Sequence, residues 1–294
     1  MAHKAGFVNI LGNPNVGKST VMNVLVGERL SVITKKMQTT RHRIKGIVNG
    51  DDFQIVYSDT PGILKPGYKL QETMMKFVDS AILDADVILF VTDIVEKPGK
   101  NPEYIERIRN SGIPVILLIN KIDISNQEEV NKLYNYWKVI FPDSDILAVS
   151  AKEKFNIGPV FDKILTLLPE NPPFFEKDVL TDRNQRFFMQ EIIREKILLN
   201  YRKEVPYSVE VLVEEFKEND SIINVRALIY VSRESQKGII IGKGGSMLKK
   251  VGKEARLDAE EFFGKKIFLE LFVKVAKDWR DKDRDLKNFG YEVY

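Results

Sequence analysis

The sequence contains no cysteine among its 294 residues. Disulfides, thiolate metal sites and a cysteine nucleophile are therefore excluded. Long apolar runs are also missing. None exceeds five residues, as in VILLI at 115–119, whereas a membrane-spanning helix needs about 20. The first twelve residues, MAHKAGFVNILG, lack the apolar segment of a signal peptide. These absences predict a cytoplasmic protein. Peripheral contact with the inner membrane stays open.

A large net charge is missing as well, since the formal charge is only +3. The hydrophobic content of 44% and charged content of 30% are those of an ordinary globular protein. Charge is nevertheless distributed unevenly. Residues 235–253 carry five lysines and no acid, whereas residues 204–220 carry six acids and one lysine. This pattern predicts an oriented surface whose basic side meets an anionic partner.

The first half of the chain alternates between short apolar runs and amphipathic segments. The runs are rich in Val and Ile, and several are apolar on both faces, as in a parallel sheet covered by helices. The alternation predicts an α/β fold with a doubly wound, mostly parallel sheet. The expected strands are 7–11, 53–59, 86–93, 114–120 and 145–150, and the expected helices are 18–27, 70–83, 102–111, 126–141 and 156–168.

A proline-rich stretch, PENPPFFEKD at 169–178, separates this region from a different pattern. Its three prolines end the preceding helix and resist a new one. We therefore expect a first domain at 1–172, a linker at 173–182 and an α+β second domain at 183–294. For the second domain the sequence predicts, in order, a helix at 183–201, strands at 207–216 and 223–232, a glycine loop, a helix at 246–262, a strand at 266–275 and a charged helix at 277–288.

The first glycine loop, GNPNVGKST at 12–20, matches the G-x-x-x-x-G-K-[ST] pattern between a strand and a helix. Glycines let the backbone wrap a phosphate, and the amides at the helix N-terminus point at the anion. Lys18 is expected to reach the β- and γ-phosphates, and Ser19 to bind Mg²⁺ through its hydroxyl. The predicted loop consists of Gly12, Asn13, Pro14, Asn15, Val16, Gly17, Lys18, Ser19 and Thr20.

Two further motifs favour guanine over adenine. NKID follows an apolar strand, so a carboxylate at its end can accept both N1–H and the exocyclic amine of guanine. Adenine lacks that donor pair and would leave buried acceptors unpaired. SAK follows the next strand, where an amide would meet the guanine carbonyl and a lysine stem would pack on the base. The predicted residues are Asn120, Lys121, Ile122, Asp123, Ser150, Ala151 and Lys152.

The DTPG motif at 59–62 lies at the end of another expected strand. Asp59 would hold Mg²⁺ through a water, and the Gly62 amide would sense the γ-phosphate. Between this motif and the first loop lies MQTTRHR, where Thr40, with Thr39 as the rival, would close over Mg²⁺. We interpret His42 there as an exposed loop residue. The motif residues expected at the nucleotide are Asp59, Thr60, Pro61, Gly62 and Ile63, and hydrolysis is expected to depend on Lys18, Thr40, Asp59 and Gly62.

These motifs resemble the translation-factor-related GTPases, and GNPNVGKST, QTTR and DTPGI together resemble the Era family. The resemblance implies GTP, GDP and Mg²⁺ as ligands. Ile63 stands where Ras-like enzymes carry a water-orienting Gln, so slow intrinsic turnover is expected. Asn15 stands where related GTPases use an Asn to hold a potassium ion, which suggests K⁺ as a further cofactor.

The second glycine loop lies in GIIIGKGGS at 238–246. Its spacing does not match a second nucleotide cradle, which leaves a plain turn or the GxxG loop of a KH module. The α-β-β-α-α-β order and the basic surroundings favour a type II KH module that binds single-stranded RNA. The expected RNA-binding residues are Ile239, Ile240 and Ile241 as an apolar groove wall, with Gly242, Lys243, Gly244, Gly245, Ser246, Lys249 and Lys250.

A GTPase domain, a proline-rich linker and a KH module together resemble the Era family over nearly the whole chain. The resemblance implies binding near the 3′ end of 16S rRNA and assistance to 30S subunit maturation. We further expect a monomer that does not bind DNA. One alternative is a GTPase whose C-terminal domain docks on a protein or an anionic membrane surface. A third hypothesis, an RNA-modification GTPase, has less support than the other two, because the sequence beyond residue 170 contains no catalytic or cofactor motif.

Overall fold

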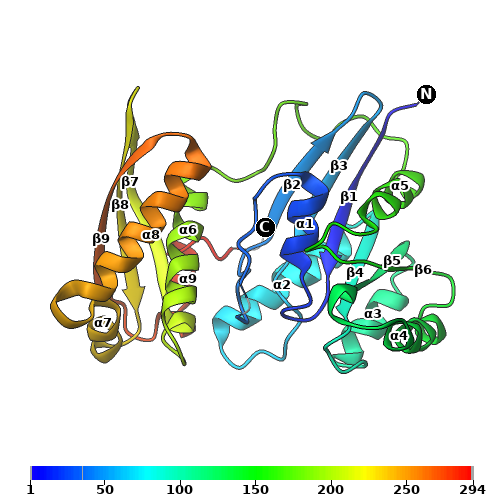
Figure 1. Ribbon diagram of the computed structural model, residues 1–294, viewed down its shortest axis with the longest axis horizontal. Helices are drawn as coiled ribbons and strands as arrows, with labels where there is room; N and C mark the ends of the chain where they lie inside the picture. Colours follow the sequence, from blue (N-terminus) through cyan, green and yellow to red (C-terminus); the bar gives the residue numbers. More distant parts are fainter. Residues whose placement is uncertain (1, 35, 293–294) are drawn as a thin grey trace. The chain divides into compact units, whose positions relative to one another are not determined.

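A six-stranded sheet forms the centre of the first unit in the computed structural model (Figure 1), which describes residues 2–34 and 36–292. The strand order is β2-β3-β1-β4-β5-β6, and every neighbouring pair is parallel except β2 and β3. The parallel α/β prediction is thereby confirmed. The strands are β1 Lys4–Leu11, β2 Ile44–Asn49, β3 Phe53–Asp59, β4 Val87–Asp93, β5 Val115–Asn120 and β6 Asp145–Ala148.

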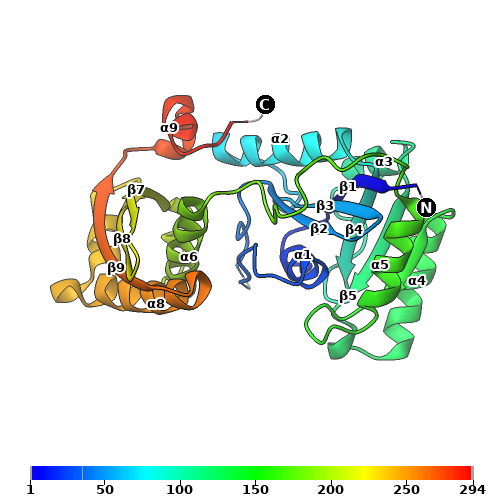
Figure 2. The same ribbon diagram turned by 90° about the horizontal axis from the view of Figure 1, so that it is seen from above.

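Helices cover both faces of this sheet, and every residue of β4 and β5 is buried as a result. Figure 2 shows α1 and α2 on opposite faces. The loops that follow β1, β3, β5 and β6 all leave the carboxyl edge of the sheet, where ligands bind in open α/β folds. The helices are α1 Lys18–Val26, α2 Lys69–Leu83, α3 Pro102–Arg109, α4 Gln127–Ile140 and α5 Ile157–Leu167, with a short 3₁₀ turn η1 at Ile122–Ile124.

Strand β2 was not predicted from the sequence. It contains Gly46, which lowers strand propensity and interrupts the apolar pattern. The structure explains this glycine, since a Cβ there would lie 2.8 Å from Met22 Cε and Val26 Cγ2. Helix α1 can therefore pack closely on the antiparallel edge strand only because the side chain is missing.

The segment 173–182 makes specific contacts with the first unit, which includes residues 71–182. Gln54 is fully buried, and its Oε1 accepts from the amides of Phe174 at 2.7 Å and Phe175 at 3.0 Å. Its Nε2 donates to the Phe175 carbonyl at 2.8 Å. Farther along, the amide of Ile47 in β2 donates to the Leu180 carbonyl at 2.8 Å. The segment expected as a linker thus runs along the edge of the sheet beside β2.

The second unit contains residues 183–292 and the short piece 68–70. Its sheet has the order β7-β8-β9, with β7 antiparallel and β9 parallel to β8. Side chains from these strands and from α6, α7 and α8 form one hydrophobic core. The elements are α6 Gln185–Asn200, η2 Pro206–Ser208, β7 Glu210–Glu218, β8 Ile222–Val231, α7 Glu234–Ile241, η3 Lys243–Gly245, α8 Ser246–Phe263 and β9 Lys266–Val275.

The continuous charged helix expected at 277–288 is wrong. The structure has a 3₁₀ turn, η4, at Trp279–Asp281 and a short helix, α9, at Asp283–Asn288. Trp279 explains the break, because its side chain is fully buried and its indole N–H donates to the Ser208 carbonyl at 2.9 Å. No helix in the described ranges is both long and apolar enough to cross a membrane.

Candidate functional site

The phosphate loop joins β1 to α1 and wraps around the side chain of Lys18. The Lys18 ammonium is buried and donates to the carbonyls of Gly12 at 3.0 Å and Asn13 at 2.9 Å. Burial lowers the pKa of Lys18 to about 8, while the nearby carboxylates of Asp59 and Glu96 oppose that shift. A lysine held by its own loop carbonyls is pre-positioned to meet phosphate oxygens.

Two positions in this loop require glycine, because each combines a positive φ with a close neighbour. Gly12 has a φ of 146°, and a Cβ there would lie 2.1 Å from the Val91 carbonyl oxygen. Gly17 has a φ of 97°, and a Cβ there would lie 2.3 Å from Asn120 Nδ2. The loop backbone therefore approaches β4 and β5 too closely for any side chain.

Three side-chain oxygens that could bind a metal ion meet at the start of α1. Ser19 Oγ donates to Asp59 Oδ2 at 2.6 Å, and Thr40 Oγ1 lies 2.9 Å from Ser19 Oγ and 3.1 Å from the same carboxylate oxygen. Burial raises the pKa of Asp59, opposed by the hydrogen bond from Ser19 and the charge of Lys18. Hydroxyl and carboxylate oxygens are the hard donors that Mg²⁺ prefers. The donor set therefore fits the expected metal.

The competing Mg²⁺ ligand, Thr39, is occupied elsewhere. Its hydroxyl donates to the Lys36 carbonyl at 2.6 Å and lies 2.7 Å from the hydroxyl of Thr34. Thr40 is buried beside Ser19, so the geometry favours Thr40 as the ligand.

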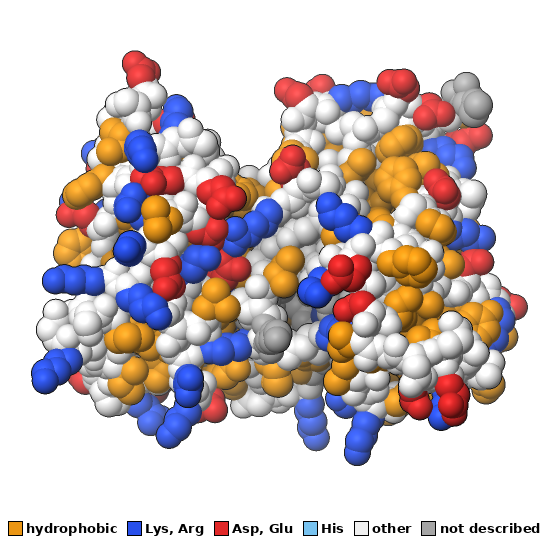
Figure 3. All heavy atoms as spheres, in the orientation of Figure 1, with side chains coloured by type: hydrophobic (Ala, Val, Ile, Leu, Met, Phe, Trp, Pro, Cys, Tyr) orange, Lys and Arg blue, Asp and Glu red, His pale blue; other side chains and the backbone are white. Residues whose placement is uncertain are grey.

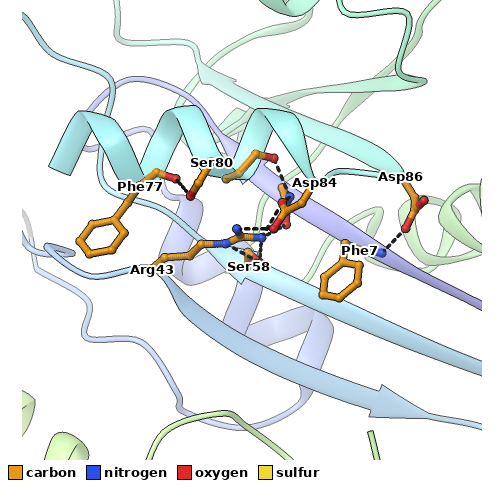
Figure 4. Close-up of polar contacts among 9 residues, drawn as sticks. Phe7, Arg43, Ser58, Phe77, Ser80, Asp84 and Asp86 are labelled. Carbon is orange, nitrogen blue, oxygen red and sulfur yellow. Dashed lines mark hydrogen bonds and ion pairs between the residues drawn. The ribbon is translucent and has the colours of Figure 1, made fainter. Parts of the chain in front are cut away.

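The segment carrying Thr40 is fixed at its far end by Arg43. The guanidinium spans from Ser58 Oγ, at 2.9 Å from Nη2, to the carboxylate of Asp84, at 2.6 Å from Nη1 (Figure 4). Asn9 Oδ1 accepts a further hydrogen bond at 3.0 Å. The side chain of Arg43 is only 9% exposed. Through these bonds Arg43, which directly precedes β2, is linked to β1, to β3 and to the residue that follows α2.

His42 in the same segment is buried rather than exposed, contrary to expectation. Its ring lies 6.1 Å from that of Phe77 on α2, centroid to centroid. The helix covers this part of the loop, and such long-range cover leaves no local signal in the sequence.

The DTPG motif lies against the phosphate loop. A Cβ on Gly62 would lie 2.7 Å from Pro14 Cα, and the amide of Ile63 donates to the Gly12 carbonyl at 3.1 Å. The Ile63 side chain is buried, so it does not replace a water-orienting Gln. Thr60 is also fully buried and donates to the Ile10 carbonyl at 2.7 Å, which makes its side chain a support of the loop rather than a nucleotide contact.

The guanine motifs meet beside the phosphate loop. Asn120 donates to the Val16 carbonyl at 2.9 Å and accepts from the Ala151 amide at 3.0 Å. Asp123 Oδ1 accepts from Ser150 Oγ at 2.6 Å. These bonds bring NKID and SAK together, with the carboxylate of Asp123 held in place by Ser150.

Two lysines of these motifs play different parts. Lys121 Nζ lies 2.5 Å from both the Asn15 carbonyl and Asp93 Oδ2, so it links the phosphate loop to the end of β4. Lys152, whose stem was expected to pack on the base, is exposed, and its Nζ donates to Glu153 at 2.7 Å.

Sequence reasoning missed Glu96 and Asn101, which lie between β4 and α3. Glu96 accepts from Asn13 Nδ2 at 2.9 Å and from the Thr92 hydroxyl at 2.7 Å. Asn101 Nδ2 lies 2.7 Å from Asn13 Oδ1 and 3.0 Å from the Ile63 carbonyl. Their one available signal was that polar residues follow a buried strand at the edge where the other motifs lie.

The second glycine loop connects α7 to α8 in the second unit. Gly242, Gly244 and Gly245 have φ values of 72°, 59° and 77°. A Cβ on Gly244 or Gly245 would meet nothing within 4 Å in the described part of the chain. The glycines thus serve the backbone conformation and leave an open surface, as close approach of a sugar-phosphate chain requires.

The expected groove wall is only partly correct. Ile240 is fully buried in the core, and its carbonyl accepts from the Tyr201 hydroxyl at 2.6 Å, so its side chain cannot contact a base. Ile241 packs against the same core, while Ile239 is 50% exposed. The reason is helical geometry, since three consecutive residues of α7 point in different directions.

Basic side chains surround this loop. Lys243, Lys249 and Lys250 are exposed, although Lys250 also lies 3.8 Å from Glu254. In Figure 3, Lys and Arg side chains project from the end of the unit that carries α7, at the lower left. The arrangement is that of an anion-binding surface.

Two family models match this chain. Residues 7–121 match the family model described as 50S ribosome-binding GTPase, and residues 204–280 match the KH domain model. The chain is 44% identical to GTPase Era of Alkaliphilus metalliredigens, over 99% of this chain and 100% of that protein. It is 43% identical to GTPase Era of Staphylococcus haemolyticus, over 98% and 97% respectively.

Solved structures give the same result. A crystal structure of Era in complex with MgGDPNP and nucleotides 1506–1542 of 16S ribosomal RNA has a TM-score of 0.94 and 39% identity, covering 99% of this chain and 100% of that one. An Aquifex aeolicus Era variant bound to GDP·AlF₄⁻ matches with the same TM-score, identity and coverage. With relatives this similar over its full length, and with both motif sets assembled, the chain belongs to the Era family of GTPases.

Proposed function

We propose that this protein is a GTP-switched RNA-binding factor that recognises the 3′ region of 16S rRNA and assists maturation of the 30S subunit. The observation that carries the proposal is the presence of two assembled sites in one chain. One is a guanine-nucleotide site with its magnesium donors, and the other is an open GxxG loop in a basic surface. In this proposal the protein acts in the cytoplasm and as a monomer.

The rRNA target rests on the relatives. The similar Era structure holds nucleotides 1506–1542 of 16S rRNA, and the KH match in this chain spans the loop at 242–245. Backbone amides and glycines of that loop would hold the sugar-phosphate chain, and the neighbouring lysines would add sequence-independent affinity.

The chain's own groups suit GTP hydrolysis by electrostatic stabilisation. Lys18 would neutralise charge at the β- and γ-phosphates, and the Gly62 amide would contact the γ-phosphate. Mg²⁺ held by Ser19 and Thr40, with Asp59 behind a water, would supply the main positive charge. Because Ile63 cannot orient water, turnover by the protein alone is expected to be slow. Asn15, exposed on the loop, is the proposed ligand for K⁺.

The test is GTP turnover by the purified protein, with and without a single-stranded RNA from the 3′ end of 16S rRNA. We expect RNA binding that weakens steeply with salt, and stimulated turnover. Gly244→Asp places a negative side chain in the open loop, so it should abolish the RNA effect and spare basal turnover. Glu234→Asp, at the far end of α7, serves as the control.

Outcomes that contradict the proposal are equally clear. RNA affinity that is unchanged in Gly244→Asp would exclude the GxxG loop as the RNA site. Absence of RNA binding, together with flotation on anionic liposomes, would instead support docking of the C-terminal domain on a membrane.

A further inference from the structure

A chain of hydrogen bonds beside the phosphate loop ends on the DTPG motif. It runs from Glu96 through Asn13 to Asn101 and then to the carbonyl of Ile63, with steps of 2.9, 2.7 and 3.0 Å. None of the nucleotide motifs contains Glu96 or Asn101. Both come from the segment between β4 and α3.

The direction of each amide in this chain follows from its two ends. A backbone carbonyl such as that of Ile63 can only accept, and an ionised Glu96 carboxylate can only accept. Asn13 must therefore turn its NH₂ toward Glu96 and its oxygen toward Asn101. Asn101 then has to donate from its NH₂ to both remaining acceptors, so both of its N–H groups are used.

Asn101 occupies the N-cap position of α3 but does not act as a cap. Its φ is 52°, and its side chain makes no capping hydrogen bond within the described residues. The side chain of Asn101, which at an N-cap would accept from a backbone N–H of its helix, instead donates to Asn13 in the phosphate loop and to the carbonyl of Ile63. This is the sign of a side chain placed for the site rather than for its own helix.

Both backbone polar groups of Ile63 are hydrogen-bonded as a result. Its amide donates to Gly12, and its carbonyl accepts from Asn101. The residue before it, Gly62, packs on Pro14 with room for no side chain. Asn101 therefore helps to fix the backbone at which the γ-phosphate is proposed to be sensed.

We propose that Asn101 is a positioning residue for the GTP state, which holds the Gly62–Ile63 backbone against the phosphate loop. GDP lacks the γ-phosphate, so its binding does not depend on this backbone. The inference rests on the proposed role of the Gly62 amide and extends it to a residue outside the motifs.

The most informative variant is Asn101→Asp. Aspartate has nearly the same shape, tolerates the same left-handed backbone and is as good an N-cap as asparagine. A negative charge at a helix N-terminus is also favourable. Helix stability alone therefore predicts an unchanged or higher melting temperature. The carboxylate would, however, face two acceptor oxygens and repel the Ile63 carbonyl.

The measurement is the affinity for GDP and for a non-hydrolysable GTP analogue, each in Mg²⁺. We expect Asn101→Asp to weaken binding of the analogue by at least about fivefold, the net value of one hydrogen bond, and to leave GDP binding unchanged. Single-turnover hydrolysis should slow in parallel. Asn101→Gly keeps the backbone conformation without the amide, so it should weaken binding of the analogue by a smaller factor and also leave GDP binding unchanged.

Asn110→Asp, at the other end of α3, introduces the same charge away from the site and should change neither affinity. Equal losses for GDP and the analogue, or no loss for either, would overturn the positioning role of Asn101. Gly62→Ala is measured in parallel. If it too leaves the ratio of the two affinities unchanged, the proposed role of Gly62 fails. If it alone shifts the ratio, only the inference about Asn101 fails.

Discussion

Asn120 Nδ2 donates to the carbonyl of Val16 across 2.9 Å, although 104 residues separate the two in sequence. The oxygen of the same side chain accepts from the Ala151 amide. One buried amide group thus joins the phosphate loop to both guanine motifs, so the phosphate and base subsites are positioned together.

Asn120→Ala is expected to weaken GDP binding by at least about tenfold. The substitution leaves the buried carbonyl of Val16 and the amide of Ala151 without a partner, each at a cost of about 1–3 kcal/mol. Titration with a fluorescent GDP analogue measures the change. Asn131→Ala, on the exposed face of α4, removes a similar side chain and should bind normally. Unaltered affinity in Asn120→Ala would refute the bridging role.

Nucleotide binding is expected to take up a proton at alkaline pH. Burial lowers the pKa of Lys18 to about 8 in the free protein, and phosphate oxygens would raise it again. Below pH 8 the lysine is already charged, so no proton is taken up. Between about pH 8 and the ordinary value of 10.5, Lys18 must take up a proton from the solvent when the nucleotide binds, so affinity should fall as pH rises.

Calorimetry of GDP binding at pH 7 and pH 9, in buffers with different ionisation enthalpies, measures this proton. Lys18→Arg should abolish the uptake, because a guanidinium stays charged throughout this range. An identical proton count at both pH values in the unaltered protein would show that Lys18 is charged before the nucleotide binds.

Asp123 is expected to decide base specificity. Its carboxylate, oriented by Ser150, would accept two N–H groups from guanine. Asp123→Asn presents a donor in place of one acceptor, so GTP affinity should fall by at least about a hundredfold, as a lost charged hydrogen-bond pair implies. Xanthosine triphosphate, with a carbonyl where guanine has an amine, should bind better than GTP. Asp143→Asn, exposed after α4, is the control in competition assays.

Gln54 is expected to hold the segment 173–182 on the first unit. Gln54→Leu retains the bulk but removes the bonds to the backbone of Phe174 and Phe175. Unpaired backbone groups should make the segment open more often. Hydrogen exchange at 174–181 should accelerate by about tenfold, with little change in the core strands. Gln127→Leu, exposed on α4, should leave exchange unaffected. Slow exchange in Gln54→Leu would mean that β2 alone retains the segment.

Potassium is expected to raise GTP turnover several-fold over sodium at equal ionic strength, because a held cation offsets charge that develops in the transition state. Asn15 has a φ of 67°, so glycine can replace it without backbone strain. Asn15→Gly should remove the difference between the two cations and leave GDP affinity nearly unchanged. Equal rates in both salts with the unaltered protein would rule out the potassium site.

Local motifs carried much of this interpretation. The phosphate loop, NKID, SAK and DTPG are short contiguous stretches whose chemistry depends on residue type and on a neighbouring strand. Each motif was expected directly after a strand, and because parallel strands present their carboxyl ends at one edge of a sheet, the motifs meet there. The glycine loop at 242–245 could be predicted for the same reason, since the need for glycine at these positions depends only on the local backbone conformation.

The sequence by itself therefore determined the fold class and indicated a guanine nucleotide and the position of the two glycine loops. Only the tertiary structure decided which of two adjacent threonines reaches Ser19, that Ile240 belongs to the core, and that Gly46 allows an edge strand to pack under α1. It alone brought Asn101 to Ile63. Each of these outcomes depends on which atoms from distant segments come within hydrogen-bond or van der Waals distance, and no local pattern of residues encodes that distance.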